Sequence, residues 1–279
     1  MIAATATDRP EIADFLRARI MQAMFPLSNL SKYGMDGGHH YAVRFWISRK
    51  AGKTTDVLTV TDGGMVMPLL PSGEFTKAAD LLRDVTVTGM AGPQRDVRGL
   101  SVICLADRTP SFDKDEPQFG LDISDLVVPQ GPGRIRPLQD APADLIKGWI
   151  YDYDVNTLNA SPDIARAQVD GTYATYIETG SHVVLMDGDT PLAMTGFNAQ
   201  LPDIVQIGGV YTPPAMRGRG HARRAVGLHL AHAAARGVRQ ATLFSASAAA
   251  ARVYRAIGFQ QIGTWSLILL APAPQVITS

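Results

Sequence analysis

The sequence predicts a mixed α/β protein with two domains, and three features lead to that class. The chain has 279 residues, of which 46% are hydrophobic and 19% charged, enough for one large or two ordinary cores. Short β-rich runs alternate along it with segments whose apolar residues recur at helical spacing. The Pro- and Gly-rich stretch at 129–133 is the strongest break in the pattern, and it predicts domains at residues 1–130 and 131–279.

The first domain is expected to open with a helix over residues 11–25, where apolar side chains follow helical spacing. A loop at 25–33 comes next. The Asp-Gly-Gly turn at 62–64 predicts a tight hairpin between strands at 57–60 and 65–70. The other expected elements are strands at 41–48, 85–88 and 121–128, helices at 75–82 and 97–103, and loops at 89–93 and 111–119.

The second domain is expected to place a strand and two helices before a meander of strands. The Asp-Gly-Asp turn at 187–189 predicts a hairpin within that meander. The expected elements are strands at 134–137, 173–177, 183–187, 192–197 and 204–211, with helices at 141–153 and 163–170.

Residues 204–222, I-V-Q-I-G-G-V-Y-T-P-P-A-M-R-G-R-G-H-A, predict a strand, a sharp turn, a glycine-rich loop and a helix that begins near His221. Gly208 and Gly209 interrupt the strand, which predicts a bulge or a ligand close to the backbone. The proline pair that follows carries no N–H, so the strand ends there. A glycine-rich loop that leads into a helix N-terminus offers free amides to an anion, most often a phosphate.

The dinucleotide fingerprint and the P-loop pattern are both absent from this loop. What is present is Gln-or-Arg-x-x-Gly-x-Gly-or-Ala, as Arg217, Gly220 and Ala222. It resembles motif A of the GNAT superfamily of acyl-CoA-dependent N-acyltransferases. Residues 248–259, A-A-A-A-R-V-Y-R-A-I-G-F, are similar to the last helix of that family. The resemblance covers about the second half of the chain and implies a mixed, mainly antiparallel sheet flanked by helices.

The first domain carries a fainter echo of the same pattern. A strand at 85–88, the sequence G-M-A-G-P at 89–93 and a helix at 97–103 repeat the order strand, loop, helix. Two interpretations stay open: a degenerate GNAT-like repeat, which would make both domains GNAT-like, or an unrelated α/β domain. Because this half lacks the arginine-rich loop, we expect the cofactor to bind in the second half only.

The resemblance implies that acetyl-CoA is the co-substrate and assigns residues to it. The backbone at Val210, Tyr211 and Thr212 would hold the pantetheine arm, and a bulge at Gly208–Gly209 would open the slot for it. The residues whose amides would hold the pyrophosphate are Gly218, Arg219, Gly220, His221 and Ala222. Arg217, Arg223 or Arg224 would neutralise the phosphates, but residues 223 and 224 cannot both face one ligand on a helix.

Tyr254 aligns with a tyrosine that serves many relatives as the general acid near the thioester sulfur. The alternative interpretation is a core residue on the apolar stripe of its helix. Ser247 predicts an N-cap, and it stands where relatives often have an asparagine that contacts the cofactor. Many relatives use a glutamate as general base in the strand before the loop, where this chain has Gln206. The candidates for the base are therefore Asp152, Asp154, Glu178 and His182, or a route through water.

The predicted function is transfer of an acetyl group from acetyl-CoA to a primary amine by direct attack in a ternary complex. The rival is a non-catalytic acyl-CoA-binding or regulatory module that kept the cofactor loop. The acceptor is expected to be a small molecule or a peptide amine, and neither its identity nor the oligomeric state follows from the sequence. A nucleic-acid role for the sequence R-G-R-G at 217–220 is disfavoured by a net charge of zero and the lack of interleaved aromatics.

Composition limits the remaining classes. A pI near 7.0 gives no overall attraction to nucleic acid or to a membrane surface. The single cysteine, Cys104, excludes an intramolecular disulfide, and with no signal-peptide pattern it favours the cytoplasm. The pair His39–His40 lacks the further ligands that a zinc site needs, so no metal is expected.

Overall fold

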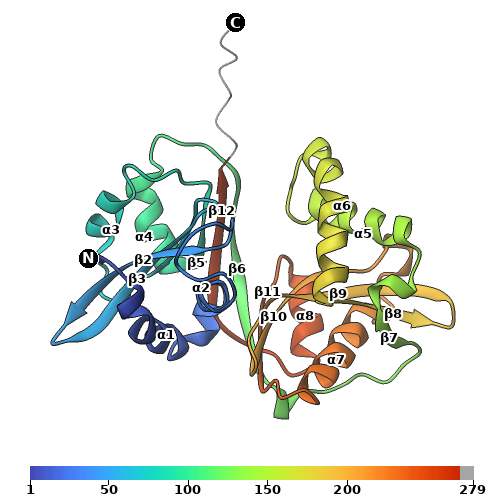
Figure 1. The fold of residues 1–279 in the computed structure, drawn as a ribbon. Coiled ribbons are helices and arrows are strands. Elements are labelled where there is room, and N and C mark those ends of the chain that lie inside the picture. Colours follow the sequence, from blue (N-terminus) through green and yellow to red (C-terminus); the bar gives the residue numbers. More distant parts are fainter. Residues whose placement is uncertain (271–279) are drawn as a thin grey trace, which may run out of the picture. The chain divides into compact units, whose positions relative to one another are not determined.

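A computed structural model describes residues 1–270, which form two compact units (Figure 1). The first unit comprises Met1–Glu116 and the described residues from Gly263 onward, and the second unit comprises Pro117–Ile262. The boundary predicted after residue 130 thus lies inside the second unit. Residues 118–122 belong to the second unit because they pair with residues 240–244 in its sheet.

The two halves of the chain repeat one order of elements: a strand, two helices, three strands, a helix, a strand, a helix and a strand. In the first half these are β1 (Ile2–Ala3), α1 (Arg9–Arg17), α2 (Ile20–Tyr33), β2 (Val43–Lys50), β3 (Lys53–Thr61), β4 (Met65–Leu69), α3 (Phe75–Leu81), β5 (Gly89–Pro93), α4 (Gln94–Cys104) and β6 (Pro110–Asp122). In the second half they are β7 (Arg134–Pro137), α5 (Ala143–Asn156), α6 (Pro162–Thr179), β8 (His182–Asp187), β9 (Thr190–Gln200), β10 (Ile204–Tyr211), α7 (His221–Ala234), β11 (Gln240–Phe244), α8 (Ala248–Arg255) and β12 (Gln260–Leu270). The expected α/β class is confirmed, and the repeat extends it to both halves.

Each unit is built on a mixed, mainly antiparallel sheet. The strand order is β1-β2-β3-β4-β5-β12 in the first unit and β6-β11-β10-β9-β8-β7 in the second. The pairs β4–β5 and β10–β11 are parallel, and the other pairs inside each unit whose register is known are antiparallel. β12 pairs with β5, from Trp265 opposite Pro93 to Leu269 opposite Gly89. β6 pairs with β11, so each half of the chain supplies the last strand of the other unit's sheet.

Helices cover both faces of the second sheet (Figure 1). Trp149 and Ile150 of α5 pack with Val184 and Met194 on one face. On the other face α7 and α8 contribute Leu230 and further side chains to the largest core of this unit. That core also includes Phe119, Leu121, Val205, Ile207, Val226, Leu243, Ala251, Tyr254, Ile257 and Phe259. In the first unit α3 and α4 pack over β3, β4, β5 and the returning β12.

Several predicted elements are confirmed, among them the hairpin at 62–64, the helix at 75–82 and the strand at 204–211. The loop expected at 25–33 is wrong, because these residues belong to α2. Helical geometry breaks at Ala23, so Pro26 lies in the first turn of the segment that restarts there. A proline is tolerated at that place because its missing N–H has no partner in a first turn.

The strand expected at 173–177 is also wrong, because α6 continues to Thr179. Tyr173, Tyr176 and Ile177 recur at a spacing of three and four, and they pack against the core formed with α5. Taken alone, a five-residue segment with four aromatic or β-branched residues resembles a strand. The helical period appears only over a longer window.

The predicted bounds of the strands β5 and β6 are wrong. Residues 89–93, expected as a loop, form β5, whereas the strand expected at 85–88 is irregular. Residues 111–119, expected as an exposed loop, lie in β6, and the strand expected at 121–128 ends at Asp122. The charged side chains of Asp113, Lys114 and Asp115 in β6 are exposed, and Arg98 pairs with the two aspartates, so this polarity concealed the strand in the sequence.

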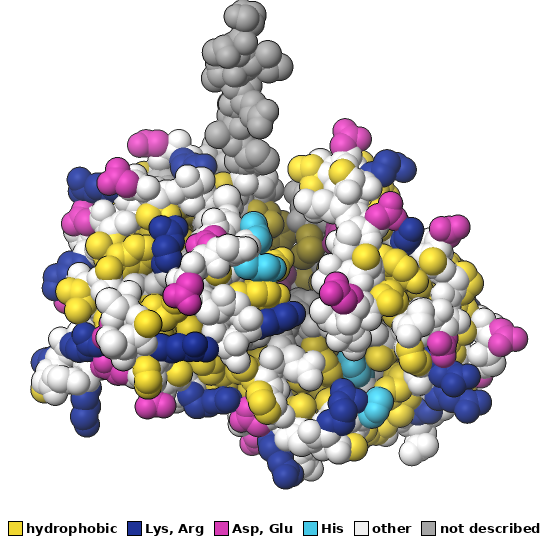
Figure 2. All heavy atoms as spheres, in the orientation of Figure 1, with side chains coloured by type: hydrophobic (Ala, Val, Ile, Leu, Met, Phe, Trp, Pro, Cys, Tyr) yellow, Lys and Arg dark blue, Asp and Glu magenta, His cyan; other side chains and the backbone are white. Residues whose placement is uncertain are grey.

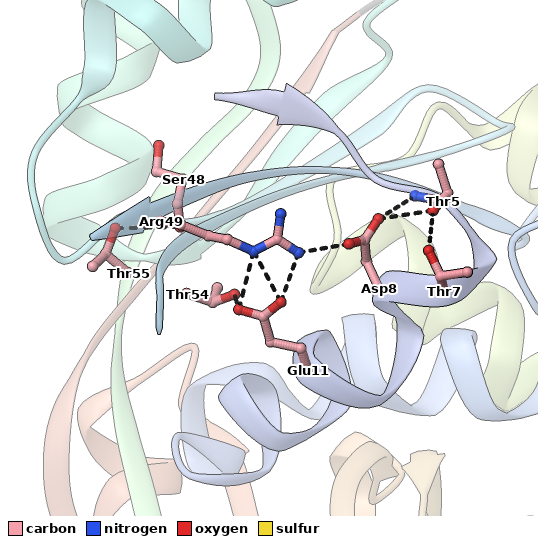
Figure 3. Close-up of polar contacts among 8 residues, drawn as sticks. All are labelled: Thr5, Thr7, Asp8, Glu11, Ser48, Arg49, Thr54 and Thr55. Carbon is pink, nitrogen blue, oxygen red and sulfur yellow. Dashed lines mark hydrogen bonds and ion pairs between the residues drawn. The ribbon is translucent and has the colours of Figure 1, made fainter. Parts of the chain in front are cut away.

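An ion-pair network fastens the start of the first unit to its sheet (Figure 3). Nη2 of Arg49 on β2 lies 2.5 Å from Asp8 and 2.6 Å from Glu11. Thr54 of β3 donates a further hydrogen bond to Glu11. The amide of Thr5 and the guanidinium of Arg49 lower the pKa of Asp8 to about 2. The network is partly exposed, and ion pairs near the surface contribute little to stability.

No helix among residues 1–270 is long and apolar enough to cross a membrane. On the face shown in Figure 2, basic and acidic side chains are interspersed, in keeping with a net charge of zero. Cys104 at the end of α4 is half-buried and packs against the first core, where burial raises the pKa of its thiol.

Candidate functional site

The strand β10 separates from its neighbour β11 partway along its length. The parallel ladder runs from Ile204–Gln240 to Gln206–Thr242, and among the described residues it goes no further. On its other edge β10 has a bulge, because Gly208 pairs with Gly196 but Tyr211 pairs with Met194. Gly209 and Val210 thus share one opposite residue, and Gly209 has a left-handed φ of 59°. The expected bulge is present, but at Gly209–Val210 and not at Gly208–Gly209, and it lies beside a fork between two parallel strands.

The loop from Thr212 to Gly220 joins this fork to the N-terminus of α7. Gly218 and Gly220 have φ values of 78° and 83°, which non-glycine residues rarely adopt. Gly220 is the N-cap of α7, and the helix begins at His221 as predicted. In the part of the chain that the structure describes, no acceptor is bound to the amides of residues 218–222. The loop and the first turn therefore present free N–H groups to an anion.

Three arginines near the loop have different surroundings. Arg217 is exposed, donates from Nε to the carbonyl of Thr212 at 3.0 Å, and lies 5.9 Å from the ring centre of Tyr211. Arg223 has a buried Nε with no hydrogen-bond partner among residues 1–270. Arg224 has its guanidinium engaged by backbone carbonyls and is therefore not available to a ligand.

Arg224 explains why residues 129–133 are not a linker between the units. Its guanidinium donates to the carbonyls of Pro129 at 2.5 Å, Pro132 at 2.8 Å and Gly133 at 2.9 Å. This Pro- and Gly-rich segment has few backbone donors of its own and presents carbonyls, which a planar guanidinium can bind together. The segment is thus fastened to α7 inside the second unit.

The last residue of β10 contacts one of the candidate bases. The hydroxyl of Tyr211 donates to Oδ2 of Asp152 on α5 at 2.8 Å. Burial, and then the neighbouring carboxylate, raise the pKa of Tyr211 to about 12. The ring of Tyr211 lies 5.9 Å from that of Trp149, so α5 and β10 are joined by packing and by a hydrogen bond.

The other candidates for the base lie in different places. Asp154 is half-buried on α5, and burial raises the pKa of its carboxyl. Glu178 is exposed near the end of α6. His182 is buried at the start of β8, against the bulge of β10. The structure thus brings Asp152 and His182 to β10, and the choice of base stays a prediction.

Tyr254 lies on α8, and Ser247 is the N-cap residue of this helix. Tyr254 is 7% exposed within the second core, and its ring meets that of Phe259 edge-on at 6.0 Å. Ser247 accepts a hydrogen bond from the amide of Ala250 at 3.1 Å, which confirms the predicted N-cap. The acid role of Tyr254 and the cofactor contact of Ser247 stay predictions.

Part of the second unit matches a known protein family. Residues 151–259 match the model of the acetyltransferase (GNAT) family, a span that includes β10, the loop and α8. The matched span lies within the second unit and identifies a GNAT acetyltransferase domain there. No curated protein matches the chain.

Solved structures extend the GNAT fold to the rest of the chain. A Drosophila protein superposes with a TM-score of 0.65 at 14% identity, over 97% of this chain and 98% of that one. A GCN5-related N-acetyltransferase from Sphaerobacter thermophilus gives 0.59 at 15% identity, over 96% and 93%. A tandem GNAT protein from the clavulanic acid biosynthesis pathway gives 0.53 at 15% identity, over 98% of both chains. At such identities the likeness shows the fold alone, and it supports two GNAT-like units.

Buried polar atoms without a partner test whether the GNAT domain suits coenzyme A. Within the described residues these atoms are Thr59 Oγ1, His182 Nε2, Thr195 Oγ1, Gln206 Oε1, Thr212 Oγ1, Arg223 Nε and His229 Nδ1. All but Thr59 lie in the second unit, on β8, β9, β10, α7 or the loop. An unpaired buried polar atom costs about 1–3 kcal/mol. Thr212 and Arg223 flank the free amides, so the residues present suit a phosphate-bearing ligand whose arm runs along β10.

The sequence did not reveal the full surroundings of the bulge. A Cβ on Gly208 would lie 2.0 Å from the Asn198 side chain, and one on Gly209 would lie 2.5 Å from His182. The glycines are therefore required by side chains from β8 and β9. The only signal in the sequence was the Gly-Gly pair itself, which does not identify the side chain that it accommodates.

Proposed function

We propose that the second unit transfers an acetyl group from acetyl-CoA to a primary amine by direct attack within a ternary complex. The GNAT domain and fold support acyl transfer, and the acetyl group and the amine are the finer part of the proposal. The fork beside Val210, Tyr211 and Thr212 would take the pantetheine arm. The amides of residues 218–222 would take the pyrophosphate, with Arg217 and Arg223 offsetting its charge.

Acyl transfer requires three groups from the protein. The thioester carbonyl needs a hydrogen-bond donor, and the bulge at Gly209–Val210 leaves backbone N–H groups next to the fork. The attacking amine needs a proton acceptor, for which Asp152 is the carboxylate held beside β10 by Tyr211. The departing thiolate needs a proton, for which we retain Tyr254. Acetyl-CoA supplies the activated acetyl group.

One observation carries the proposal: the loop amides without acceptors lie at the end of a strand that has separated from its parallel neighbour. A phosphate site alone would need only the loop. A slot between strands is suited to a long ligand arm that hydrogen-bonds to the exposed strand edge. The two together fit an acyl-CoA better than a simple phosphate.

Binding can be tested with a matched pair of glycine variants. At 100 times its dissociation constant, acetyl-CoA should stabilise the protein by about 2.7 kcal/mol and raise the Tm. Gly220→Asp should abolish this shift, because it puts a negative charge in the pyrophosphate site. Gly73→Asp is the control, since Gly73 also precedes a helix and has a similar φ of 78°. An acetyl-CoA shift that survives in a folded Gly220→Asp variant would exclude the assignment.

The acid role can be tested by removing one hydroxyl. Tyr254→Phe keeps the ring and its contact with Phe259, and should lower kcat about 10²–10⁴-fold, the range for lost acid–base catalysis. Acetyl-CoA affinity should change little. If no acceptor is known, slow hydrolysis of acetyl-CoA is the fallback assay. Equal rates in wild type and variant, with chemistry rate-limiting, would make Tyr254 a core residue only.

The rival function, an acyl-CoA-binding module without turnover, predicts the same thermal shift. The two functions differ in whether the thioester of acetyl-CoA is cleaved. Release of free thiol in the presence of a panel of primary amines supports the enzyme, whereas tight binding with no release over the whole panel supports the module.

A further inference from the structure

Gln206 is a buried glutamine at the point where β10 leaves β11. The residue is 2% exposed and lies opposite Thr242 in the last pair of the parallel ladder. Beyond this pair, in the described part of the chain, β10 has no partner on the side of β11. Gln206 therefore stands at the inner end of the fork that the proposed function assigns to the arm of acetyl-CoA.

The amide nitrogen of Gln206 replaces a donor of the strand that has separated. The amide of Gln240 donates to the carbonyl of Asp203 at 3.0 Å, so the polar backbone groups of residue 203 face β11. Alternate residues of a strand direct these groups to the same neighbour, so those of Val205 and Ile207 face β11 as well. Nε2 of Gln206 donates to the Ile207 carbonyl at 2.8 Å. The side chain thus caps the first carbonyl beyond the ladder and fills the inner end of the fork.

The amide oxygen of Gln206 is left without a partner. Because a carbonyl oxygen only accepts hydrogen bonds, the Ile207 carbonyl fixes Nε2 toward itself and Oε1 away from it. Oε1 is buried and unpaired among residues 1–270. Thr242 does not supply a hydrogen, since its hydroxyl donates to the carbonyl of Phe119 at 2.9 Å. One hydrogen bond thus holds the head of the side chain, and no solvent-filled space adjoins its oxygen.

The distance from the loop to this side chain suits the length of the arm. From Thr212 back to Ile207, this edge of β10 spans roughly 17 Å at about 3.3 Å per residue. An extended pantetheine arm has a similar length, so phosphates bound at residues 218–222 would place the thioester near Ile207. The acyl group would then meet the head of the Gln206 side chain.

We propose that Gln206 is a specificity-determining residue, which restricts the slot to short acyl groups such as acetyl and propionyl. A longer chain would need the space that the Gln206 amide fills, and it would have to displace Nε2 from the Ile207 carbonyl. That carbonyl would then be buried without a donor, and an alkyl chain offers none to Oε1 either. The inference rests on the proposed function and adds to it the class of acyl group.

The chain contains a matched control in Gln118. It is 1% exposed on β6, and its Nε2 donates to the Thr242 hydroxyl at 3.4 Å. β6 pairs with the edge of β11 that is turned away from the fork. Gln206→Ala and Gln118→Ala each remove a buried amide, but only Gln206→Ala opens the inner end of the fork. If a buried amide matters only for stability, both variants should lower the Tm and leave the preference for acyl length unchanged.

Calorimetric titration with coenzyme A thioesters of increasing length tests the inference without an acceptor amine. The wild type should bind hexanoyl-CoA about 10–100-fold more weakly than acetyl-CoA, the range for one buried carbonyl left unpaired. In Gln206→Ala this difference should shrink to less than about threefold, because the affinity for hexanoyl-CoA rises. Gln118→Ala should keep the wild-type ratio of the two affinities.

Equal affinities of the wild type for acetyl-CoA and hexanoyl-CoA would overturn the inference, and that measurement needs no variant. A wild-type ratio in Gln206→Ala, or a lost preference in Gln118→Ala as well, would also overturn it. If Gln206→Ala fails to fold, Gln206→Met keeps the length of the side chain and loses the hydrogen bond to Ile207. An unchanged ratio in that variant would count against the inference in the same way. A wild type that binds none of these thioesters would instead overturn the proposed function.

Discussion

Two connections occupy equivalent places in the repeated order of elements and differ in what they can bind. In the second unit residues 212–220 join β10 to α7, a helix of 14 residues. In the first unit residues 70–74 join β4 to α3, a helix of only 7 residues. Both follow a strand that is parallel to the next one in its sheet. The topology is the same, but only one connection is long enough to curve around an anion.

The chemistry of the shorter connection is also different. The amide of Leu70 donates to Asp96 at 2.9 Å, and the amide of Ser72 donates to Asp56 at 2.9 Å. Both carboxylates are buried, with 4% and 0% of their residues exposed. In the first unit the protein's own carboxylates thus bind amides of this connection, whereas in the second unit the amides of residues 218–222 have no acceptor among the described residues. A repeated fold can keep its framework while one copy fills its anion site from within.

The largest expected effect concerns where the second unit begins. A fragment of residues 131–279 lacks residues 118–122, so β11 loses its neighbour and the core loses Phe119 and Leu121, both at most 2% exposed. We expect this fragment to be unfolded or aggregated. A fragment of residues 117–262 keeps the whole unit and should melt cooperatively with an acetyl-CoA shift. Circular dichroism with and without acetyl-CoA separates the two, and a folded, ligand-binding 131–279 fragment would contradict the strand exchange.

The next effect separates neighbouring arginines of α7. Arg223→Ala should weaken acetyl-CoA binding about 10–100-fold, the equivalent of one lost charged hydrogen bond of about 1.5–3 kcal/mol, with little change in the Tm of the free protein. Arg224→Ala should lower the Tm of the free protein, because it removes the donor that binds the carbonyls of Pro129, Pro132 and Gly133. It should change acetyl-CoA affinity little. Calorimetric titration and thermal melts of both variants measure this. Similar losses of affinity in both would mean that Arg224 also reaches the ligand.

The smallest effect probes the carboxylate that fills the first unit's connection. Burial raises the pKa of Asp96, so the folded state favours the protonated acid. Its stabilising contribution is therefore complete below about pH 4 and is lost as the pH rises through the raised pKa. Asp96→Asn keeps an oxygen for Leu70 and carries no charge. The difference in Tm between Asp96→Asn and wild type should shift in favour of the variant between about pH 3.5 and pH 7. The corresponding change in the free energy of unfolding should lie within the roughly 0.5–3 kcal/mol typical of single substitutions.

Asp84→Asn, at an exposed position of the same unit, controls for the loss of one negative charge. A difference between Asp96→Asn and wild type that stays constant over this pH range would show that burial does not govern Asp96. Neither variant should create a second acetyl-CoA site, because the connection would still have only five residues. Titration to a stoichiometry of one per chain tests that point.

In the first half, the predicted echo of the glycine-rich loop falls on the wrong segment. It aligned G-M-A-G-P at 89–93 with the glycine-rich loop, but these residues form β5, the counterpart of β11. The true counterpart, residues 70–74, carries no motif because its amides bind carboxylates from β3 and α4. A pattern of glycines and apolar residues does not distinguish a loop from a buried strand.

The sequence alone determined the features that depend on a few consecutive residues. The turn at 62–64, the N-cap at Ser247 and the glycine-rich entry to α7 follow from backbone preferences and local hydrogen bonds, and all three are present. Tertiary structure alone decided which strand completes which sheet, that Arg224 binds carbonyls rather than a ligand, and that His182 rests on the bulge. These depend on contacts between residues as far apart as Phe119 and Thr242, which are separated by 123 positions. No local preference encodes such a pairing, because its energy comes from surfaces that meet only after the chain has folded.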